Sequence, residues 1–323
     1  MLSFRPLPLL GNPHVQTILG NYLNGERRNL GGMRRVVALP DGDRIALSET
    51  PPHARHAHQP IALLVHGLGG CHRSANMVRV TTRLSDLGWR VVRMDLRGAG
   101  AGVRLARRYY NAACSDDIRV VIEHLAAAYP ESPIAVVGFS LGGNIVLKLA
   151  GEGADLPMPA VRAVAALGPP IDLVRCSELL ACYPLYDAFY VRNLTRQVAQ
   201  HQELHPDVQR IVFPRRTTLR QFDDLYTAPR WGYASALDYY RRASALPWVP
   251  RIRVPTFILT ARDDPFVAVE PFETVAAPPT VEIHISEHGG HLGFLGPDGN
   301  GGIRWGETRL IQWLERQMAQ RVC

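Results

Sequence analysis

Residues 138–142 (GFSLG) carry the strongest chemical signal in the sequence. They match G-x-S-x-G, the pattern in which a serine occupies a tight turn between a strand and a helix and projects its hydroxyl clear of the sheet. The apolar run before the motif predicts that strand, and residues 141–150 predict the helix. We therefore predict that Ser140 is a nucleophile. The amide of Leu141 then lies at a helix N-terminus, where N–H groups stabilise an oxyanion.

A nucleophilic serine requires a base and an acid that orients the base. In this type of site they follow the serine in the order acid, then histidine. The acid is expected directly after a late strand, where residues 260–266 (TARDDPF) contain Asp263 and Asp264.

The base is expected in a loop before the last helix, where residues 287–293 (EHGGHLG) contain two histidines. We predict His291 as the base, because it lies among three glycines that indicate a close backbone approach at a site. His288 is the weaker candidate, since it follows the strand too soon and precedes two of these glycines.

A second amide for the oxyanion is expected in the loop after the third strand, residues 66–70 (HGLGG). Gly67 lets this loop turn back, and the amide of Leu68 is the predicted donor. We interpret His66 as a structural histidine that forms a hydrogen bond beneath the loop rather than as a base.

Two further segments contain residue patterns of ligand sites. Residues 97–102 (RGAGAG) follow a strand, but their G-x-G-x-G spacing differs from the dinucleotide fingerprint, so we predict no nucleotide cofactor. His53, His56 and His58 could bind a metal, but no helix or strand pattern frames them, and a solvated loop is the prediction. Neither a metal nor an organic cofactor is predicted.

The site requires alternating strands and helices to position it. Strands are predicted at 34–39, 43–48, 61–65, 89–95, 133–139, 161–167, 254–260 and 280–285, and helices at 75–87, 116–129, 141–150 and 305–320. The first two strands form a predicted hairpin around Pro40-Asp41-Gly42, and Ser115 is the predicted cap of the second helix. This alternation predicts an α/β fold with a mostly parallel sheet.

The alternation stops at Pro169-Pro170, and residues 171–246 show helical spacing without a good strand. We predict a core of residues 1–170 and 247–323, with residues 171–246 inserted as a helical cap over Ser140. Seven apolar and aromatic residues of the insertion predict one apolar helical face: Leu179, Leu180, Tyr183, Leu185, Tyr186, Phe189 and Tyr190.

The composition is that of a globular protein. Of 323 residues, 46% are hydrophobic and 20% are charged, which excludes disorder, collagen and coiled coil. The formal net charge is +7, but the arginines are scattered without a run of five basic residues, so we predict no nucleic-acid partner. The mild positive field favours anionic substrates and is compatible with a transient contact with a membrane surface.

The five cysteines have irregular spacing and no C-x-x-C pair, which indicates neither a disulfide framework nor a zinc site and favours a cytoplasmic location. The N-terminal segment lacks the long apolar region of a signal peptide, and no run of 18 apolar residues predicts a membrane span. The oligomeric state is not indicated by the sequence.

The chain resembles the YheT-like branch of the α/β-hydrolases, which is related to abhydrolase-domain lipid hydrolases. The stretches that carry the resemblance are 12–17 (NPHVQT), 66–70, 97–100, 138–144, 222–244, 261–266 and 289–295. The resemblance implies an α/β-hydrolase fold and a carboxylic ester hydrolase with a serine nucleophile and a helical cap. Several members act on acylglycerol or phospholipid acyl esters. Many relatives carry G-x-x-D in the acid loop, which places the acid at Asp264 and leaves Asp263 as a loop acceptor.

The expected activity is hydrolysis of short-to-medium acyl esters, with acylglycerols among the candidate substrates, through a Ser140–His291–Asp264 triad and an acyl-enzyme. A thioesterase or an amidase remains an alternative, because the triad does not distinguish leaving groups. A catalytically silent scaffold is disfavoured, because all three triad positions are occupied.

Overall fold

A single eight-stranded sheet forms the centre of the molecule. The computed structural model describes residues 3–23, 30, 32–52 and 58–319. The strands are β1 (Met33–Ala38), β2 (Arg44–Thr50), β3 (Ile61–Val65), β4 (Arg90–Asp95), β5 (Ile134–Phe139), β6 (Val161–Leu167), β7 (Thr256–Ala261) and β8 (Val281–Ser286). They are arranged in the order β1-β2-β4-β3-β5-β6-β7-β8, and only the β1–β2 and β2–β4 pairs are antiparallel. The predicted mostly parallel sheet and the N-terminal hairpin are confirmed.

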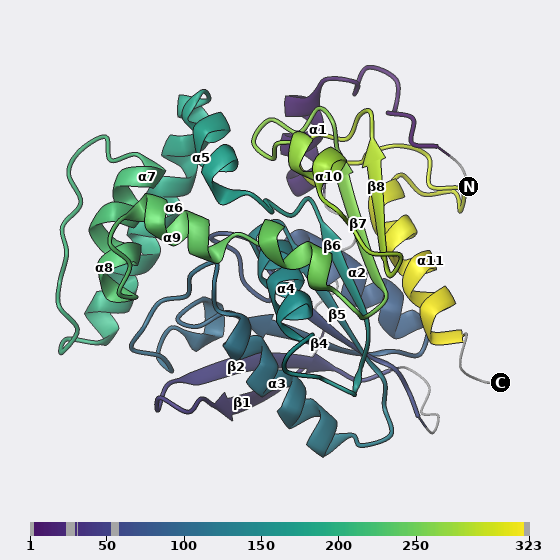
Figure 1. Cartoon of the computed structure of the whole chain (residues 1–323), viewed down its shortest axis with the longest axis horizontal. Coiled ribbons are helices and arrows are strands. Elements are labelled where there is room, and N and C mark those ends of the chain that lie inside the picture. The colour runs from purple at the N-terminus through teal and green to yellow at the C-terminus, as the bar shows by residue number, and fades with distance from the viewer. Residues whose placement is uncertain (1–2, 24–29, 31, 53–57, 320–323) are drawn as a thin grey trace.

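Helices pack on both faces of this sheet (Figure 1). The core helices are α1 (Pro13–Tyr22), α2 (Ala75–Asp86), α3 (Ser115–Ala128), α4 (Leu141–Glu152), α10 (Glu270–Thr274) and α11 (Trp305–Ala319). Successive residues of the buried strands face opposite sides, so each strand contributes to two separate cores. Leu63 and Val136 join the core formed with α3 and α4, whereas Leu64 and Val137 join the core formed with α2 and α11.

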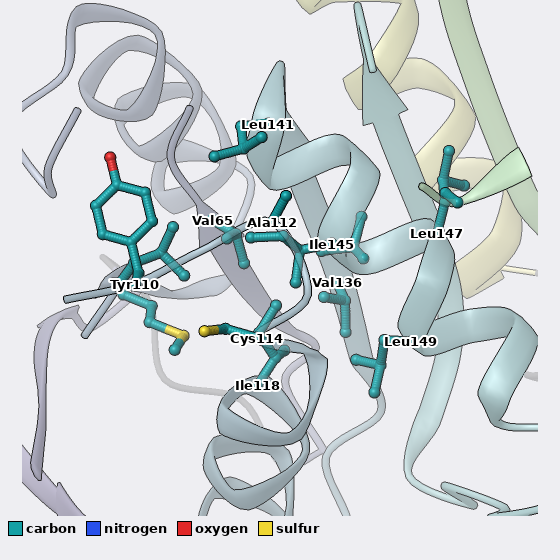
Figure 2. Packing of buried hydrophobic residues seen from close by; sticks show 14 of the residues in the cluster. Val65, Tyr110, Ala112, Cys114, Ile118, Val136, Leu141, Ile145, Leu147 and Leu149 are labelled. Atoms are coloured by element: carbon teal, nitrogen blue, oxygen red, sulfur yellow. The ribbon is translucent and has the colours of Figure 1, made fainter. Parts of the chain in front are cut away.

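The α3–α4 core lies directly beneath the turn that carries Ser140. Figure 2 shows Ile118 of α3 and Ile145 of α4 directed toward Val65 of β3 and Val136 of β5. These four side chains are fully buried, and each gains about 1.5–3 kcal/mol from removal from water. The β5-turn-α4 unit is therefore held on a rigid base.

Residues 171–246 form helices and no strand, and all of them are described. The helices are α5 (Leu173–Ala181), α6 (Pro184–Leu204), α7 (Leu219–Phe222), the π-helix η2 (Asp223–Thr227), α8 (Ala228–Arg230) and α9 (Ala236–Ala243). They gather beside one end of the sheet, on the left of Figure 1. Short 3₁₀ turns occur at Gly100–Gly102 and Leu246–Arg251.

Two local predictions were wrong. Ser115 does not cap α3: the helix begins at Ser115, Cys114 is the N-cap, and the Ser115 hydroxyl instead accepts a hydrogen bond from Lys148 Nζ at 3.2 Å. The apolar residues of the insertion do not share one helical face, because Pro184 begins a new helix after α5 has ended. Leu185 is consequently 88% exposed.

The structure also contains helix α1, which the sequence analysis did not predict. Asn12 caps it by accepting hydrogen bonds from the backbone N–H groups of His14 and Val15, and Pro13 occupies the first helical position. An asparagine followed by proline is a recognised helix start, so the signal was present in the sequence. Among the described residues, no helix has the length and apolarity needed to cross a membrane.

Candidate active site

Ser140 occupies a strained turn between β5 and α4. Its backbone has φ 51° and ψ −121°, a region that L-residues rarely adopt. The flanking glycines make the turn sterically feasible: a Cβ on Gly138 would lie 2.3 Å from the Gly142 carbonyl oxygen, and a Cβ on Gly142 would lie 2.5 Å from the His66 carbonyl oxygen. The predicted strand-turn-helix context of the serine is present.

The structure joins Ser140, His291 and Asp264 in one chain of hydrogen bonds. The His291 Nε2 atom lies 2.9 Å from Ser140 Oγ, and His291 Nδ1 lies 2.7 Å from Asp264 Oδ2. The three residues come from separate segments, after β5, β7 and β8, whose carboxyl ends meet at one edge of the sheet.

The environment of Asp264 determines which His291 nitrogen carries the proton. The other carboxylate oxygen, Oδ1, accepts hydrogen bonds from the backbone N–H groups of Phe266 and Val267, each at 3.0 Å. Oδ2 therefore accepts from Nδ1–H, and Nε2 of the neutral imidazole is left as an acceptor for the Ser140 hydroxyl. The ring of Phe266 packs on the imidazole with a centroid distance of 4.5 Å.

The neighbouring residues Asp263 and His288 lie outside this chain. Asp263 Oδ1 accepts a hydrogen bond from the Gly290 backbone N–H at 2.9 Å, and Asp263 Oδ2 lies 3.2 Å from His288 Nδ1. The His288 side chain is half exposed, whereas the His291 side chain is 5% exposed. The geometry thus separates the two aspartates and the two histidines into different pairs.

Two backbone amides are available beside Ser140. The N–H groups of Leu68 and Leu141 have no hydrogen-bond partner among the residues that the structure describes, and both residues line the cavity that contains Ser140 and His291. The loop approaches the serine closely, since a Cβ on Gly67 would lie 3.0 Å from the Ser140 Cβ. This arrangement can hold an oxyanion that forms on a carbonyl bound at Ser140.

A family model described as the alpha/beta hydrolase fold matches residues 60–297 of the chain. The chain belongs to the alpha/beta hydrolase family. The predicted resemblance and the predicted fold class are confirmed. Relatives that are named as an esterase and a lipase support an enzyme that hydrolyses ester bonds.

Several curated relatives of this hydrolase are known. An Escherichia coli (strain K12) protein named "Putative esterase YheT" is 32% identical over 99% of this chain and 95% of its own length. The human "Phospholipase ABHD3" is 28% identical over 80% of this chain and 66% of its own length. The yeast (Saccharomyces cerevisiae) "Monoacylglycerol lipase" is 28% identical over 80% of this chain and 59% of its own length.

Solved structures agree with the fold. The Pyrococcus furiosus esterase Pf2001 superimposes with a TM-score of 0.61 at 16% identity, covering 91% of this chain and 94% of that chain. A lipase candidate from Acinetobacter baumannii, lip1, gives a TM-score of 0.58 at 20% identity, covering 95% and 97% of the two chains. At these identities the likeness concerns the fold alone.

The hydrolase fixes its 66–70 loop through buried hydrogen bonds. His66 accepts a hydrogen bond from the Leu96 backbone N–H at Nε2 (3.1 Å) and donates from Nδ1 to the Gly67 carbonyl oxygen (2.8 Å). Burial lowers the pKa of His66, which favours the neutral ring that this pattern requires. His66 is therefore a structural histidine, as predicted. Gly69 of the same loop donates to the Tyr110 hydroxyl at 2.7 Å.

Within the described ranges, one group of three residues has its candidate metal-ligand atoms no more than 4.8 Å apart: Cys71, His72 and Asp95. Asp95 already accepts hydrogen bonds from the His72 backbone, the His72 ring and the Ala101 backbone. Burial also raises the pKa of the Cys71 thiol, which disfavours the thiolate that metals bind. We therefore interpret this group as structural: its hydrogen bonds hold the surrounding loops, and it is not a metal site. His53 and His56 lie outside the described residues.

Two hollows meet at Ser140. The inner one is a cavity of about 110 Å³, lined mainly by residues of the 171–246 helices, among them the apolar Leu173, Leu180 and Leu194. The outer one is an open groove of about 850 Å³ between α1 and the start of α6, lined by Ile18, Leu185 and other exposed apolar residues. Both hollows are lined by the same five residues: Leu68, Ser140, Tyr190, Phe266 and His291.

Asp223 is the buried carboxyl of the inner cavity. It lies on the π-helix η2 and accepts a hydrogen bond from the Tyr240 hydroxyl at 2.6 Å. Burial raises the pKa of Asp223 to about 6 from its ordinary value of 3.8. The folded state therefore binds the proton of the Asp223 carboxyl more tightly than the unfolded chain does. As a result, ionisation of Asp223 lowers the free energy of unfolding as the pH rises from about 4 to about 6.

Asp223→Asn should remove this pH dependence, because the amide cannot ionise. The unfolding free energy of the variant minus that of the wild type is expected to increase by on the order of 3 kcal/mol between pH 4 and pH 7. Denaturant titrations at several pH values measure this difference. The exposed neighbour Asp224 supplies the matched control, and Asp224→Asn should show a nearly constant difference. A constant difference for Asp223→Asn as well would contradict the prediction.

Proposed function

We propose that this protein is a serine carboxylic ester hydrolase that acts on short-to-medium acyl esters through an acyl-enzyme. The observation that carries the proposal is the hydrogen-bond chain from Ser140 Oγ through the His291 ring to a buried Asp264. The relatives named as esterase, lipase and phospholipase support an ester bond as the target.

The proposed mechanism assigns one role to each group. His291 Nε2 takes the proton from Ser140 Oγ while the oxygen attacks the acyl carbonyl, and the amides of Leu68 and Leu141 stabilise the oxyanion. His291 then donates this proton to the leaving alcohol as the ester C–O bond breaks. Water, activated in turn by His291, hydrolyses the acyl-enzyme and returns Ser140 to its starting state. Asp264 keeps the imidazole oriented and stabilises its protonated form.

The two hollows suggest how the substrate divides between them. The alcohol must leave, and water must enter, while the acyl group is still attached to Ser140. The groove is the larger hollow and is lined by exposed residues such as Ile18 and Leu185, which permits this exchange. We therefore assign the alcohol part to the groove and the acyl chain to the smaller inner cavity. In this assignment the 171–246 helices act as the cap that excludes water and sets the acyl length.

The cavity volume predicts the acyl preference. A protein cavity of about 150 Å³ accommodates benzene, so about 110 Å³ corresponds to a chain of roughly four carbons. Each methylene that enters adds up to ~0.8 kcal/mol of transition-state binding. We expect kcat/KM to rise roughly tenfold or more from acetate to butanoate esters of one alcohol and to stop rising once the cavity is full. A series of graded acyl esters measures this profile.

A cavity-filling variant tests the assignment of the acyl chain. Leu180 is 6% exposed and lines the cavity, so Leu180→Trp should shift the optimum toward acetate. Leu185 lies in the groove and is 88% exposed, so Leu185→Ala is the control and should keep the wild-type profile. If acetate is the best substrate of the wild type, or if Leu180→Trp keeps the same profile, the cap has only a structural role.

A fluorophosphonate probe tests the function itself, because it reacts covalently with activated serines. Stoichiometric labelling of the wild type is expected, together with hydrolysis of butanoate esters. Thioesters and amides of the same acyl group are included in the assay, and faster turnover of either would reassign the leaving group. A protein that is neither labelled nor active on any of the three would be a silent scaffold.

A further inference from the structure

Helix α1 is hydrogen-bonded to the loop that carries His291. We define the histidine loop as residues 289–296. Thr17 Oγ1 accepts a hydrogen bond from the His291 backbone N–H at 2.8 Å and donates to the Pro13 carbonyl oxygen at 2.7 Å. Thr17 and His291 are each 4% exposed. The hydroxyl thus fixes the main chain of His291 to the first turn of α1.

Gln16 makes a second attachment four residues further along the loop. Its Oε1 accepts a hydrogen bond from the Leu295 backbone N–H at 2.7 Å, and its Nε2 donates to the Leu295 carbonyl oxygen at 3.2 Å. Nε2 also donates to the Leu10 carbonyl oxygen at 2.7 Å. Gln16 is fully buried, so each of these bonds satisfies a polar group that has no access to water.

Glycines bring the two backbones into direct contact. A Cβ on Gly290 would lie 2.3 Å from the Pro13 carbonyl oxygen, and a Cβ on Gly293 would lie 2.5 Å from the Gln16 carbonyl oxygen. On the helix, a Cβ on Gly20 would lie 2.7 Å from the Gly293 Cα. The close approach that the sequence predicted around His291 is therefore an approach to α1.

The histidine loop is strained on the C-terminal side of His291. Leu292 has φ 60° and Phe294 has φ 40°, both in the left-handed region that disfavours L side chains. Such conformations persist only where the surrounding structure imposes them. The hydrogen bonds from Thr17 and Gln16 lie on either side of this strained pair.

We propose that Thr17 and Gln16 are positioning residues: they hold the strained histidine loop so that the imidazole of His291 faces both Ser140 and Asp264. They act through the loop main chain and not on the reacting atoms. The inference rests on the proposed role of His291 as the catalytic base. It also gives the 12–17 segment (NPHVQT) a function that the triad alone does not explain.

Thr17→Val tests the proposal, because valine has nearly the same shape but lacks the acceptor. The buried His291 N–H loses its partner, and the loop can relax. A displacement of about 1 Å at a catalytic group can cost 10²-fold, so we expect kcat for a butanoate ester to fall roughly 10- to 100-fold with KM changed less than about twofold. Thr17→Ser restores the acceptor and should recover most of kcat.

Thr81→Val is the matched control. Thr81 is fully buried in α2, and its hydroxyl donates to the Met77 carbonyl oxygen four residues earlier, as Thr17 does to Pro13. The control should keep the wild-type kcat while losing the same local bond. Circular dichroism and unfolding midpoints establish that each variant is folded, and Thr17→Ala replaces Thr17→Val if the latter does not fold.

The outcomes separate this inference from the proposed function. A wild type that is labelled by fluorophosphonate, combined with a Thr17→Val variant whose kcat matches that of Thr81→Val, overturns the positioning role alone. A failure of Thr17→Ser to recover kcat does the same. If the wild type has no esterase activity, the proton NMR signal of His291 Nδ1–H still reports the loop: an unchanged signal in Thr17→Val overturns the inference, and a shifted or lost signal supports it.

Discussion

Ser140→Ala is expected to lower kcat for butanoate esters by ~10⁶-fold and to abolish labelling by a fluorophosphonate probe. The hydroxyl is the only protein group in the proposed mechanism that forms a covalent bond with the acyl carbon, so no neighbouring side chain replaces it. The fold should persist, because alanine, like serine, carries an unbranched Cβ at the φ 51° turn, and within the part of the chain that the structure describes the side-chain hydrogen bond lost is that to His291 Nε2. Mass spectrometry of the labelled protein and circular dichroism measure the two effects.

Ser177→Ala is the control for this experiment. Ser177 lines the inner cavity, as Ser140 does, but the Ser177 hydroxyl donates to the Val174 carbonyl oxygen at 2.8 Å within its own helix. This variant should be labelled to the same stoichiometry as the wild type. Full labelling of Ser140→Ala would show that another residue is the nucleophile.

Asp264→Asn is expected to lower kcat by on the order of 10⁴-fold. Asp264 Oδ1 accepts two backbone hydrogen bonds, so the remaining oxygen of asparagine stays at that position and the new amide NH₂ faces His291. Nδ1 must then accept, which places the imidazole proton on Nε2, next to Ser140 Oγ. A donor at that position cannot take the proton of the serine hydroxyl, and steady-state kinetics should therefore show a fall in kcat.

Asp263→Asn provides the comparison one residue away. Asp263 accepts from the Gly290 backbone N–H, a bond that the asparagine oxygen can retain. We expect a much smaller loss of kcat than for Asp264→Asn. If the two variants exchange these effects, Asp263 is the orienting acid and the geometry of the neighbouring loop must change during catalysis.

Much of the fold could be predicted because local sequence patterns govern it. Both ends of every predicted strand and core helix lie within two residues of the corresponding ends in the structure. Buried parallel strands such as Ile61–Val65 are continuous apolar runs, and glycines or prolines bound them in the sequence. The G-x-S-x-G turn is equally local, because its strain and its glycines lie within five consecutive residues.

The acid loop and the helical insertion were only partly predictable. Two adjacent aspartates have the same local signal, and the sequence favoured Asp264 only through the G-x-x-D pattern of its relatives. The contacts of Asp264 with His291 and of Asp263 with Gly290 give the physical distinction. In the insertion, spacing alone suggested one apolar face, whereas the start of α6 at Pro184 turned Leu185 outward into the groove. Helix direction after a break depends on what each helix packs against.

The sequence by itself determined the order of the strands and of the predicted core helices along the chain, the G-x-S-x-G turn and the small set of residues from which a triad could be built. Only the tertiary structure decided that the N-terminal segment supports the histidine loop, through bonds between residues such as Thr17 and His291 that lie 274 positions apart. It also decided that two hollows meet at Ser140. The physical reason is that backbone preference acts over a few neighbouring residues, whereas buried hydrogen bonds and cavities depend on which distant segments the sheet brings together.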